Sequence, residues 1–575
     1  MTTMHRLTPL SLCLLLGACA GNTSAPADRA LREDAATAAS HSTAEPPAPS
    51  RHEARHDMLA DRHTLAKTAV GGMMAMPAQR IAVAPESPPY LPPADRERYQ
   101  ALDDNPLRTV AEAPVSTFSI DVDTGSWSNA RRFISSGRLP PSDAVRVEEF
   151  INYFPYDYAP PRGDTPFAVH TDTARAPWDA DKILLRIALK GQDQAKETLP
   201  PANLVFLVDV SGSMQSADKL PLLKSALKLL VAQLRPQDHI ALVTYAGAAQ
   251  VALPATPGDH KATILAAIDQ LRAGGSTAGA SGIELAYQSA RAGFKDGGIN
   301  RILLATDGDF NVGMTDFRQL KGRVEQQRAS GVSLSTLGFG TGNLNEHLME
   351  QLADAGDGAY AYIDTLMEGH KVLVNEMTST LATIAKDVKI QVEFNPATVR
   401  DYRLIGYENR QLAREDFSND KVDAGDIGAG HTITALYELT PVGARSLIEP
   451  LRYGSDPRPG AATTGRSAEL AHVRLRYKRP GAHTSALIEQ PVAAGPVPAL
   501  ATRSDDFRFA VAIAGFGQHL RGGKYTGQWS LADARALAAG ATGTDRFGHR
   551  GEALRLIELA AALDVPSPHP ARRIE

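Results

Sequence analysis

The chain has 575 residues, of which 43% are hydrophobic and 22% charged, with a formal net charge of −5. Single domains usually hold about 100–200 residues, so we expect two or three domains with linkers. The balanced charge lacks the basic excess that nucleic-acid binding needs, so we expect no nucleic-acid partner. The chain contains two cysteines, Cys13 and Cys19, and their position excludes a disulfide framework or a cysteine-ligated metal from the later domains.

Residues 1–18 have the pattern of a signal peptide. The apolar run over residues 10–16 suits a leader and is too short to span a bilayer. It ends in Leu-Gly-Ala-Cys at Cys19, which resembles a bacterial lipobox, and this resemblance implies a lipid on the Cys19 thiol. Ala20 stands where inner-membrane lipoproteins usually have aspartate, which favours the outer membrane of a Gram-negative bacterium, on its periplasmic or surface face. An ordinary secretory signal with a chance cysteine is the alternative.

Residues 19–105 are expected to form a flexible, lipid-anchored tether. They are rich in Ala, Pro, Ser and His and show no sustained structural period, so they bury too little apolar area to offset the entropy of ordering. His52 and His56 lie in a match to the H-E-x-x-H zinc-protease pattern. That chemistry needs a packed helix and a third ligand, which the charged surroundings do not offer. A zinc hydrolase therefore remains a disfavoured alternative.

Residues 106–199 are expected to form an α+β region. A strand is predicted at 118–122 and helices at 126–136 and 144–153. The Asp-Thr-Gly triplet at Asp123 matches the aspartic-protease sequence, but the chain offers no second copy to share the proton. We therefore interpret the triplet as a turn.

Residues 200–386 alternate apolar strands with amphipathic helices, which predicts a doubly wound α/β fold. We expect strands at 204–208, 239–245, 302–306 and 333–339, and helices at 219–234, 282–292 and 366–384. Ligands of such folds bind outside the carboxyl ends of the strands.

Three loops of this domain carry oxygen-bearing side chains at suitable places. They are Asp209, Ser211 and Ser213 after the first strand, Thr277 on a Gly-Gly-Ser-Thr loop, and Asp307 after a later strand. Asp and Ser at alternate positions can turn their oxygens toward one point, and such an array suits a hard cation such as Mg²⁺. A phosphate loop or a plain turn is the alternative, but three loops would then have to agree by chance.

The three loops together resemble the metal-ion-dependent adhesion site (MIDAS) of a von Willebrand factor type A (vWA) domain. Segments 116–124, 152–156 and 303–311 also resemble the bacterial YfbK-like lipoproteins. The resemblance covers nearly everything from residue 116 onward. It implies a doubly wound, Rossmann-like vWA domain between a family-specific N-terminal region and a C-terminal region.

The resemblance also implies a role for each site residue. Ser211 and Ser213 would bind the ion directly, and Thr277 directly or through water. Asp209 and Asp307 would act largely through water. The implied ion is Mg²⁺, with Mn²⁺ or Ca²⁺ as alternatives, and an acidic side chain of a protein partner would fill the open coordination position.

Residues 387–575 are expected to form a β-rich domain followed by helices. The periodicity predicts strands at 388–394, 399–405, 432–439 and 471–477, and helices at 506–520, 531–539 and 550–563.

The leading functional hypothesis is a non-enzymatic, lipid-anchored binding protein of the cell envelope with a role in adhesion or assembly. A hydrolase has little support, because Ser216-x-x-Lys219 lacks the companion motifs of the penicillin-binding enzymes. An EF-hand is not expected at Asp307-x-Asp309-x-Asn311, because the glycine that should follow is displaced. An adaptor for an ATPase machine is the third hypothesis, and the exported N-terminus argues against it.

Overall fold

The computed structural model describes residues 96–276, 279–308, 317–449, 452 and 468–564. Several residues that the sequence singles out lie outside these ranges: Cys19, His52, His56, Thr277, Asp309 and Asn311. None of the helices in the described ranges combines the length and the apolar character that crossing a membrane requires.

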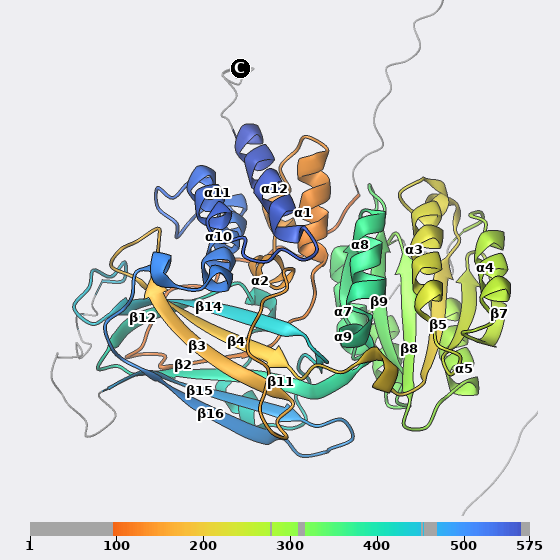
Figure 1. Ribbon diagram of the computed structural model, residues 1–575, viewed down its shortest axis with the longest axis horizontal. Coiled ribbons are helices and arrows are strands. Elements are labelled where there is room, and N and C mark those ends of the chain that lie inside the picture. The colour runs from red at the N-terminus through yellow and green to blue at the C-terminus, as the bar shows by residue number, and fades with distance from the viewer. Residues whose placement is uncertain (1–95, 277–278, 309–316, 450–451, 453–467, 565–575) are drawn as a thin grey trace, which may run out of the picture. The chain divides into compact units, whose positions relative to one another are not determined.

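A six-stranded sheet forms the centre of an α/β domain (Figure 1). Its strand order is β10-β9-β8-β5-β6-β7; the β6–β7 pair is antiparallel and the other pairs are parallel. The strands are β5 (Ala202–Asp209), β6 (His239–Tyr245), β7 (Ala249–Pro257), β8 (Ile299–Thr306), β9 (Ser333–Phe339) and β10 (Tyr360–Ile363). Central strands such as β5 are continuous apolar runs because both of their faces are covered. The predicted doubly wound fold is confirmed.

Two layers of helices cover this sheet. Leu204 and Phe206 of β5 belong to one apolar core, with α3 (Leu220–Gln233) and α4 (Lys261–Gln270). Val205 and Leu207 point to the other face and belong to a second core. The helices of that second layer are α5 (Gly279–Ala292), α6 (Phe317–Arg328) and α7 (Glu346–Ala355). Alternate strand residues therefore serve opposite helix layers.

The last segment of the α/β domain corrects the single long helix predicted over residues 366–384. The chain instead forms α8 (Leu366–His370), a π-helical turn η4 (Lys371–Asn375) and α9 (Met377–Leu381), and β11 begins at Thr383. The Thr-Ser-Thr sequence in α9 is a weak helix former. From Thr383 onward, the backbone pairs with another strand instead of continuing the helix.

A second body consists of two antiparallel sheets packed face to face. One has the order β1-β12-β14-β4-β3; the other has β13-β11-β15-β16, with β2 also paired to β11. The strands are β1 (Arg108–Thr109), β2 (Val115–Ser119), β3 (Phe167–Arg175), β4 (Ile183–Gly191), β11 (Thr383–Phe394), β12 (Val399–Ile405), β13 (Ile427–Gly428), β14 (Thr432–Pro441), β15 (Glu469–Lys478) and β16 (Ala486–Ala493). Phe394 of β11 stacks on Tyr402 of β12 across the shared core, with ring centroids 4.2 Å apart.

Strands from both ends of the chain share these sheets. Sequence reasoning separated residues 106–199 from residues 387–575, yet β4 pairs with β14 and β2 pairs with β11. Strand β4 is not among the strands predicted from the sequence. Its residues are buried on both faces, because Leu185 packs into the core between the sheets while Leu184 packs against helices.

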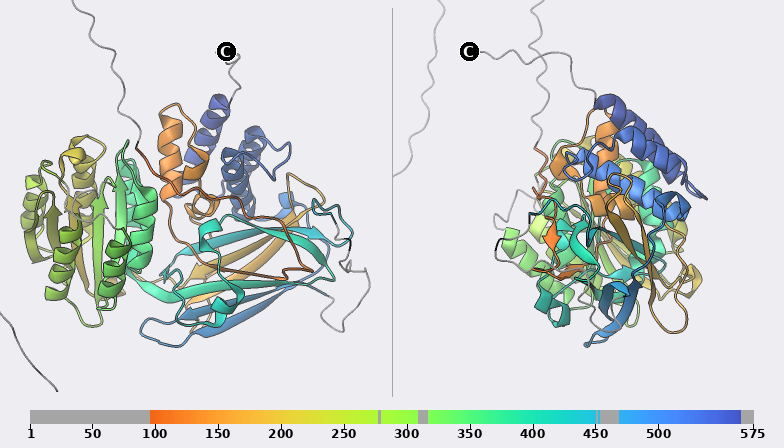
Figure 2. Two further views of the ribbon diagram at one scale, coloured as in Figure 1. Left: turned by 180° about the vertical axis from the view of Figure 1, so that it is seen from behind. Right: turned by 90° about the vertical axis from the view of Figure 1, so that its left-hand side faces the viewer.

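A layer of helices packs on the outer face of the sheet that contains β4 (Figures 1 and 2). It joins α1 (Gly125–Ser135) and α2 (Val147–Asn152) with α10 (Asp505–Leu520), α11 (Leu531–Ala539) and α12 (His549–Leu563). Trp127 of α1 meets Phe150 of α2 and Phe516 of α10 in edge-to-face contacts, with ring centroids 5.1 and 6.2 Å away. The N-terminal and C-terminal regions thus share one apolar core.

Residues 96–105, which the composition assigns to the tether, belong to the folded part. The amide of Arg96 donates to the carbonyl of Gly342 at 2.9 Å, and the amide of Arg98 donates to the carbonyl of Leu344 at 2.8 Å. Between them, Glu97 forms an ion pair with Arg132 at 2.8 Å. The carboxyl end of the expected tether is therefore bonded to the α/β domain.

Candidate metal centre

The candidate centre lies at the carboxyl ends of β5 and β8. β5 ends at Asp209, and a loop with the 3₁₀-helix η3 (Gly212–Gln215) leads into α3. The amide of Gly212 donates to the carbonyl of Gly275 at 3.0 Å, which ties the loop after β5 to the glycine-rich loop before α5. Gly275 has a φ of 84°, a left-handed conformation that favours glycine. Two of the three predicted loops are thus held together by their backbones.

Asp209 is fully buried and its carboxylate is held on both oxygens. Oδ1 accepts from the amide of Ser211 at 2.8 Å, and Oδ2 accepts from the hydroxyls of Thr306 at 2.9 Å and Tyr245 at 3.3 Å. Burial raises the pKa of Asp209 to about 6, although the hydrogen bonds from Ser211 oppose it; the charge of nearby Asp307 raises it further. A cation close to Asp209 would favour its charged form.

The two serine hydroxyls have the spacing of neighbouring metal ligands. The Oγ atoms of Ser211 and Ser213 form a hydrogen bond of 3.0 Å, in which either hydroxyl could be the donor. Ligands at right angles around an octahedral Mg²⁺ with bonds of about 2.0–2.1 Å are separated by about 2.8–3.0 Å. Ser211 is buried and Ser213 is exposed, so the pair lies at the boundary between core and solvent. These residues fit a divalent cation that remains accessible to a partner.

Asp307 follows β8 and is also fully buried. Its Oδ2 atom accepts a hydrogen bond at 2.9 Å from the ammonium of Lys219, which also donates to Oδ1 of Asn343 at 2.8 Å. Next to it, Gly308 has a φ of 94°, and a side chain there would collide with the backbone at Asn345. The backbone at the end of β8 is thus tightly packed. Lys219 and a bound metal ion would both interact with the carboxylate of Asp307, so the two positive charges would compete for it.

The donor set decides which ions the centre could hold. Carboxylate and hydroxyl oxygens suit Mg²⁺, Mn²⁺ and Ca²⁺ rather than softer metals. Across the described ranges, no group of three or more His, Cys, Asp or Glu side chains is arranged to hold a metal ion. The candidate centre instead combines two carboxylates with hydroxyls. Its fifth predicted ligand, Thr277, lies outside the described residues.

The structure adds four residues to the site that sequence reasoning did not assign. Thr306 and Tyr245 orient Asp209, and Lys219 and Asn343 contact each other beside Asp307. The Thr-Asp-Gly sequence already contained Thr306, so its role could have been anticipated. Lys219 was considered only as part of the Ser216-x-x-Lys219 motif. Its partner Asn343 lies 124 residues further along the chain, and no local sequence pattern identifies it as a site residue.

Comparisons with known proteins cover almost the whole described part. The family described as "von Willebrand factor type A domain" matches residues 203–376, "von Willebrand factor" matches 93–186, and "Uncharacterized protein YfbK, C-terminal" matches 379–563. The Escherichia coli (strain K12) protein described as "Uncharacterized protein YfbK" is 52% identical over 470 residues, which are 80% of this chain and 81% of that protein. The chain belongs to the YfbK family.

Two further similarities are confined to parts of the chain or to the fold. The magnesium-chelatase 60 kDa subunit of Rhodobacter capsulatus is 31% identical over 165 residues, which are 28% of this chain and 29% of that protein. The solved structure of a von Willebrand factor type A protein from Catenulispora acidiphila is 18% identical, covers 69% of this chain and 91% of its own, and has a TM-score of 0.38.

The vWA match places the candidate centre inside a domain of known type. It begins one residue after the start of β5 and includes all three predicted loops. Domains of this type often bind a divalent metal ion, and they mediate protein–protein interactions. A role in protein interaction or adhesion is therefore supported.

Proposed function

We propose that this protein is a lipid-anchored, non-enzymatic binding protein of the cell envelope. Its vWA domain would hold Mg²⁺ and recognise an acidic side chain of a protein partner. The observation that carries the proposal is the 3.0 Å spacing of the Ser211 and Ser213 hydroxyls beside two buried carboxylates. The family match supports the broader role in protein interaction.

Each residue of the centre has a distinct task in this proposal. Bound Mg²⁺ would supply positive charge and an open coordination position for the partner's carboxylate. Ser211 and Ser213 offer neutral oxygens at the spacing of ligands. Asp209 and Asp307 provide the negative charge that favours the cation. Thr306 fixes the orientation of the Asp209 carboxylate through a 2.9 Å hydrogen bond, so the charge is already positioned before a cation arrives.

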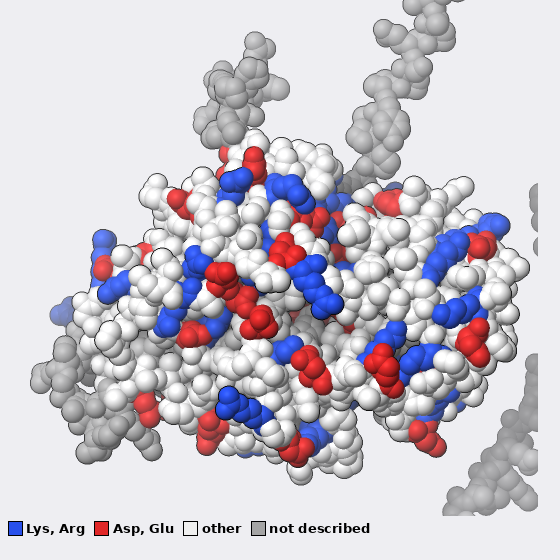
Figure 3. Space-filling model, in the orientation of Figure 1, with Lys and Arg blue, Asp and Glu red and all other residues white. Residues whose placement is uncertain are grey.

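Surface charge favours a local mode of recognition. On the face shown in Figure 3, basic and acidic side chains are interspersed over the described part, without a broad area of one sign. Such a face offers little long-range attraction to a strongly charged partner.

The lipid anchor and the outer-membrane location are parts of the proposal that rest on the sequence around Cys19. Several acyl chains, each contributing about 0.8 kcal/mol per buried CH₂, would hold the protein stably at the membrane. We expect Cys19→Ser to release the protein into the soluble fraction. Retention of this variant in membranes after washing with high salt and carbonate would show that another element anchors it.

Partner capture tests the binding mechanism. The full chain is immobilised and incubated with solubilised envelope extract in Mg²⁺, in excess chelator, and in chelator followed by fresh Mg²⁺. We expect bound protein to appear with Mg²⁺, to disappear with chelator and to return on replenishment. Capture that is equal in all three conditions would reject the metal-dependent mechanism. The same samples, assayed for zinc-dependent peptide cleavage with His52→Ala/His56→Ala as the control, test the hydrolase alternative.

A further inference from the structure

One buried arginine of this protein differs from all the others in the described part. Six arginines are buried there, and five of them have a carboxylate within 4.0 Å: Arg131, Arg146, Arg186, Arg403 and Arg550. The sixth, Arg301, has no carboxylate within that distance among the described residues. A buried charge without a counter-charge is costly. Arg301 therefore needs a specific explanation.

The hydrogen bonds of Arg301 leave much of its guanidinium unused. Arg301 lies near the start of β8 and donates from Nη1 to the hydroxyl of Ser335 at 2.8 Å. Its buried Nε has no hydrogen-bond partner in the described part of the chain. Burial lowers the pKa of Arg301 to about 10, although the charges of Asp426 and Asp357 oppose this shift. Even at this pKa the guanidinium is charged at neutral pH.

The nearby carboxylates already have cationic partners of their own. Asp357 pairs with Arg328 at 2.7 Å and with Lys386 at 2.9 Å. Asp426 lies 3.7 Å from the same lysine, and burial raises its pKa to about 7. These groups therefore do not neutralise Arg301 by direct contact.

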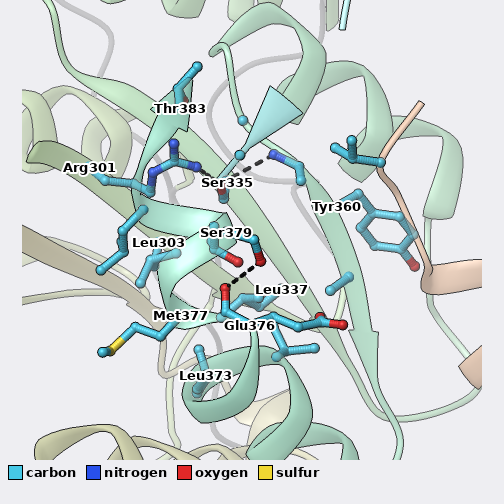
Figure 4. A pocket seen from close by; sticks show the side chains of 18 of the residues that line it. Arg301, Leu303, Ser335, Leu337, Tyr360, Leu373, Glu376, Met377, Ser379 and Thr383 are labelled. Atoms are coloured by element: carbon cyan, nitrogen blue, oxygen red, sulfur yellow. Dashed lines mark hydrogen bonds between the residues drawn. The ribbon is translucent and has the colours of Figure 1, made fainter. Parts of the chain in front are cut away.

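Arg301 lines a cavity between the sheet of the vWA domain and the segment that follows it (Figure 4). The cavity has a volume of about 90 Å³. Leu303 and Leu337 of the sheet lie on one side, with Leu373 and Met377 of the η4–α9 segment on the other. Three acidic residues, Asp357, Asp426 and Glu376, also line the cavity, and each has a lysine within 4.0 Å. A mainly apolar chamber with an arginine at one end, whose acidic groups are already paired, has the composition of a binding site for an amphiphilic anion.

We propose that this cavity binds a small carboxylic acid with a short apolar tail, whose carboxylate pairs with Arg301. The planar guanidinium can present two parallel N–H donors to a carboxylate. The tail would lie among Leu303, Leu337 and Leu373. A phosphate would carry more charge and would leave these apolar walls unfilled.

The size of the cavity limits the ligand. A void of about 150 Å³ can hold the six carbons of benzene, so the smaller volume here suits a tail of roughly three to five carbons. Such a ligand would contact strands β8 and β9 as well as the broken helical segment before β11. Its binding is therefore expected to stabilise the vWA domain against unfolding.

The experiment measures binding of hexanoate, hexanol and inorganic phosphate to the full chain carrying Cys19→Ser, so that no covalent acyl group competes. Calorimetry gives the affinities, and thermal unfolding gives the stabilisation. We expect hexanoate to bind at least about tenfold more tightly than hexanol, the uncharged analogue. At a hexanoate concentration tenfold above Kd, Tm should rise by about 2 °C. No binding of hexanoate, or equal binding of phosphate, would overturn the proposal.

Three variants separate this site from nonspecific binding. Arg301→Met should lose the preference for hexanoate over hexanol, whereas Arg272→Met, the same change at an exposed arginine, should keep it. Ala361→Leu retains Arg301 but fills the cavity that Ala361 lines, and it should abolish binding of both compounds. If Arg301→Met does not fold, Ala361→Leu still tests whether hexanoate binds in this cavity. Unchanged hexanoate binding in a folded Arg301→Met or Ala361→Leu protein would contradict the proposed site.

Discussion

Two groups of buried carboxylates in this protein differ in what balances their charge. At the candidate metal centre, Asp209 accepts hydrogen bonds from neutral hydroxyls and an amide, and Asp307 contacts one lysine. In the second group, the ionic junction, the carboxylates surround Arg146 and Arg410. Its buried members are Asp121, Asp123, Glu149, Glu346 and Glu350, and the partly exposed Asp354 lies at its edge.

Arg410 shows how the ionic junction connects distant parts of the chain. Its Nη2 atom lies 3.2 Å from Asp121 and 3.1 Å from Asp123, which precede α1. The same atom lies 3.3 Å from Glu350 of α7, and Nη1 lies 2.7 Å from Asp354. One guanidinium from the loop after β12 thus joins the vWA domain to the N-terminal region.

The two groups differ in where the neutralising charge comes from. Side chains of the protein neutralise the carboxylates of the ionic junction, whereas a cation from solution can contribute at the metal centre. A guanidinium that is part of the chain cannot leave, so the ionic junction is a fixed structural connection. At the metal centre, the ammonium of Lys219 contacts Asp307, while Ser213 is exposed to solvent. A cation from solution can therefore complete the charge balance there.

The largest effect is expected from removing the internal cation of the ionic junction. Arg410→Met leaves four carboxylates without that partner, and we expect the free energy of unfolding to fall by about 3–5 kcal/mol. Urea denaturation at pH 7 measures the change. Arg535→Met is the matched control, because Arg535 pairs with Glu558 on the surface, and it should cost less than about 1 kcal/mol. Equal losses in both variants would mean that the junction contributes no more than a surface ion pair.

Removing a charge from the metal centre should leave the fold intact but abolish cation binding. Asp209→Asn keeps the shape of the side chain and relieves the burial of a carboxylate. We expect Mg²⁺ affinity to fall at least about a hundredfold, since charge on the ligands drives binding of hard cations. Isothermal titration with Mg²⁺ measures this loss. Asp218→Asn, on the same loop, should bind Mg²⁺ like the unchanged protein, and a normal affinity in Asp209→Asn would remove Asp209 from the centre.

The ionic junction should also respond to pH. Burial raises the pKa of Glu346, a member of the junction, to about 8, against the opposing charge of Arg146. Burial also raises the pKa of Glu148, which precedes the member Glu149 in the chain, to about 8, and the charge of Glu408 adds to this shift. The folded protein keeps protons that the unfolded chain, with glutamate pKa values near 4.5, releases. Stability should therefore fall as the pH rises from about 5 to 8, and then level off.

Urea denaturation between pH 5 and 9 measures this decline, and Glu346→Gln tests its origin. Glutamine cannot ionise, so the variant should lose less stability over the same range, and it should equal or exceed the unchanged protein at pH 9. Metal-free buffer keeps the vWA centre from contributing a cation-dependent change. A decline that is equally steep in Glu346→Gln would assign it to other groups.

The smallest of these effects is expected from the lysine that both balances and competes at the metal centre. Lys219→Met removes the ammonium 2.9 Å from Oδ2 of Asp307, so Mg²⁺ should bind about tenfold more tightly. Titration calorimetry at two salt concentrations measures the affinity. Lys228→Met, at an exposed position of α3, is the control for a general change in charge. A weaker affinity in Lys219→Met would show instead that Lys219 positions Asp307 for the ion.

Local sequence determined the bounds of several strands and the positions of the candidate metal ligands on their loops. The strands at 239–245 and 333–339 have the predicted bounds. The first contains the continuous apolar run Ile-Ala-Leu-Val, which suits a buried strand, whereas the second mixes leucine and phenylalanine with serine and threonine. The ligand motifs were visible because their residues alternate on loops next to such strands. Asp209, Ser211 and Ser213 are separated by one residue each, so their proximity is a local property. Thr277 remains a prediction.

Only the tertiary structure decided which distant charges meet. Lys219 and Asp307 are 88 residues apart, and Arg410 and Asp121 are 289 residues apart. Strand β4 is another such case, since its buried position depends on pairing with β14, whose sequence lies beyond the whole vWA domain. Arg301 is the clearest example, because its sequence neighbours do not show that no carboxylate of the described residues lies within 4.0 Å of it. Periodicity reports burial of a single segment, whereas charge balance in the core depends on which segments the fold brings together.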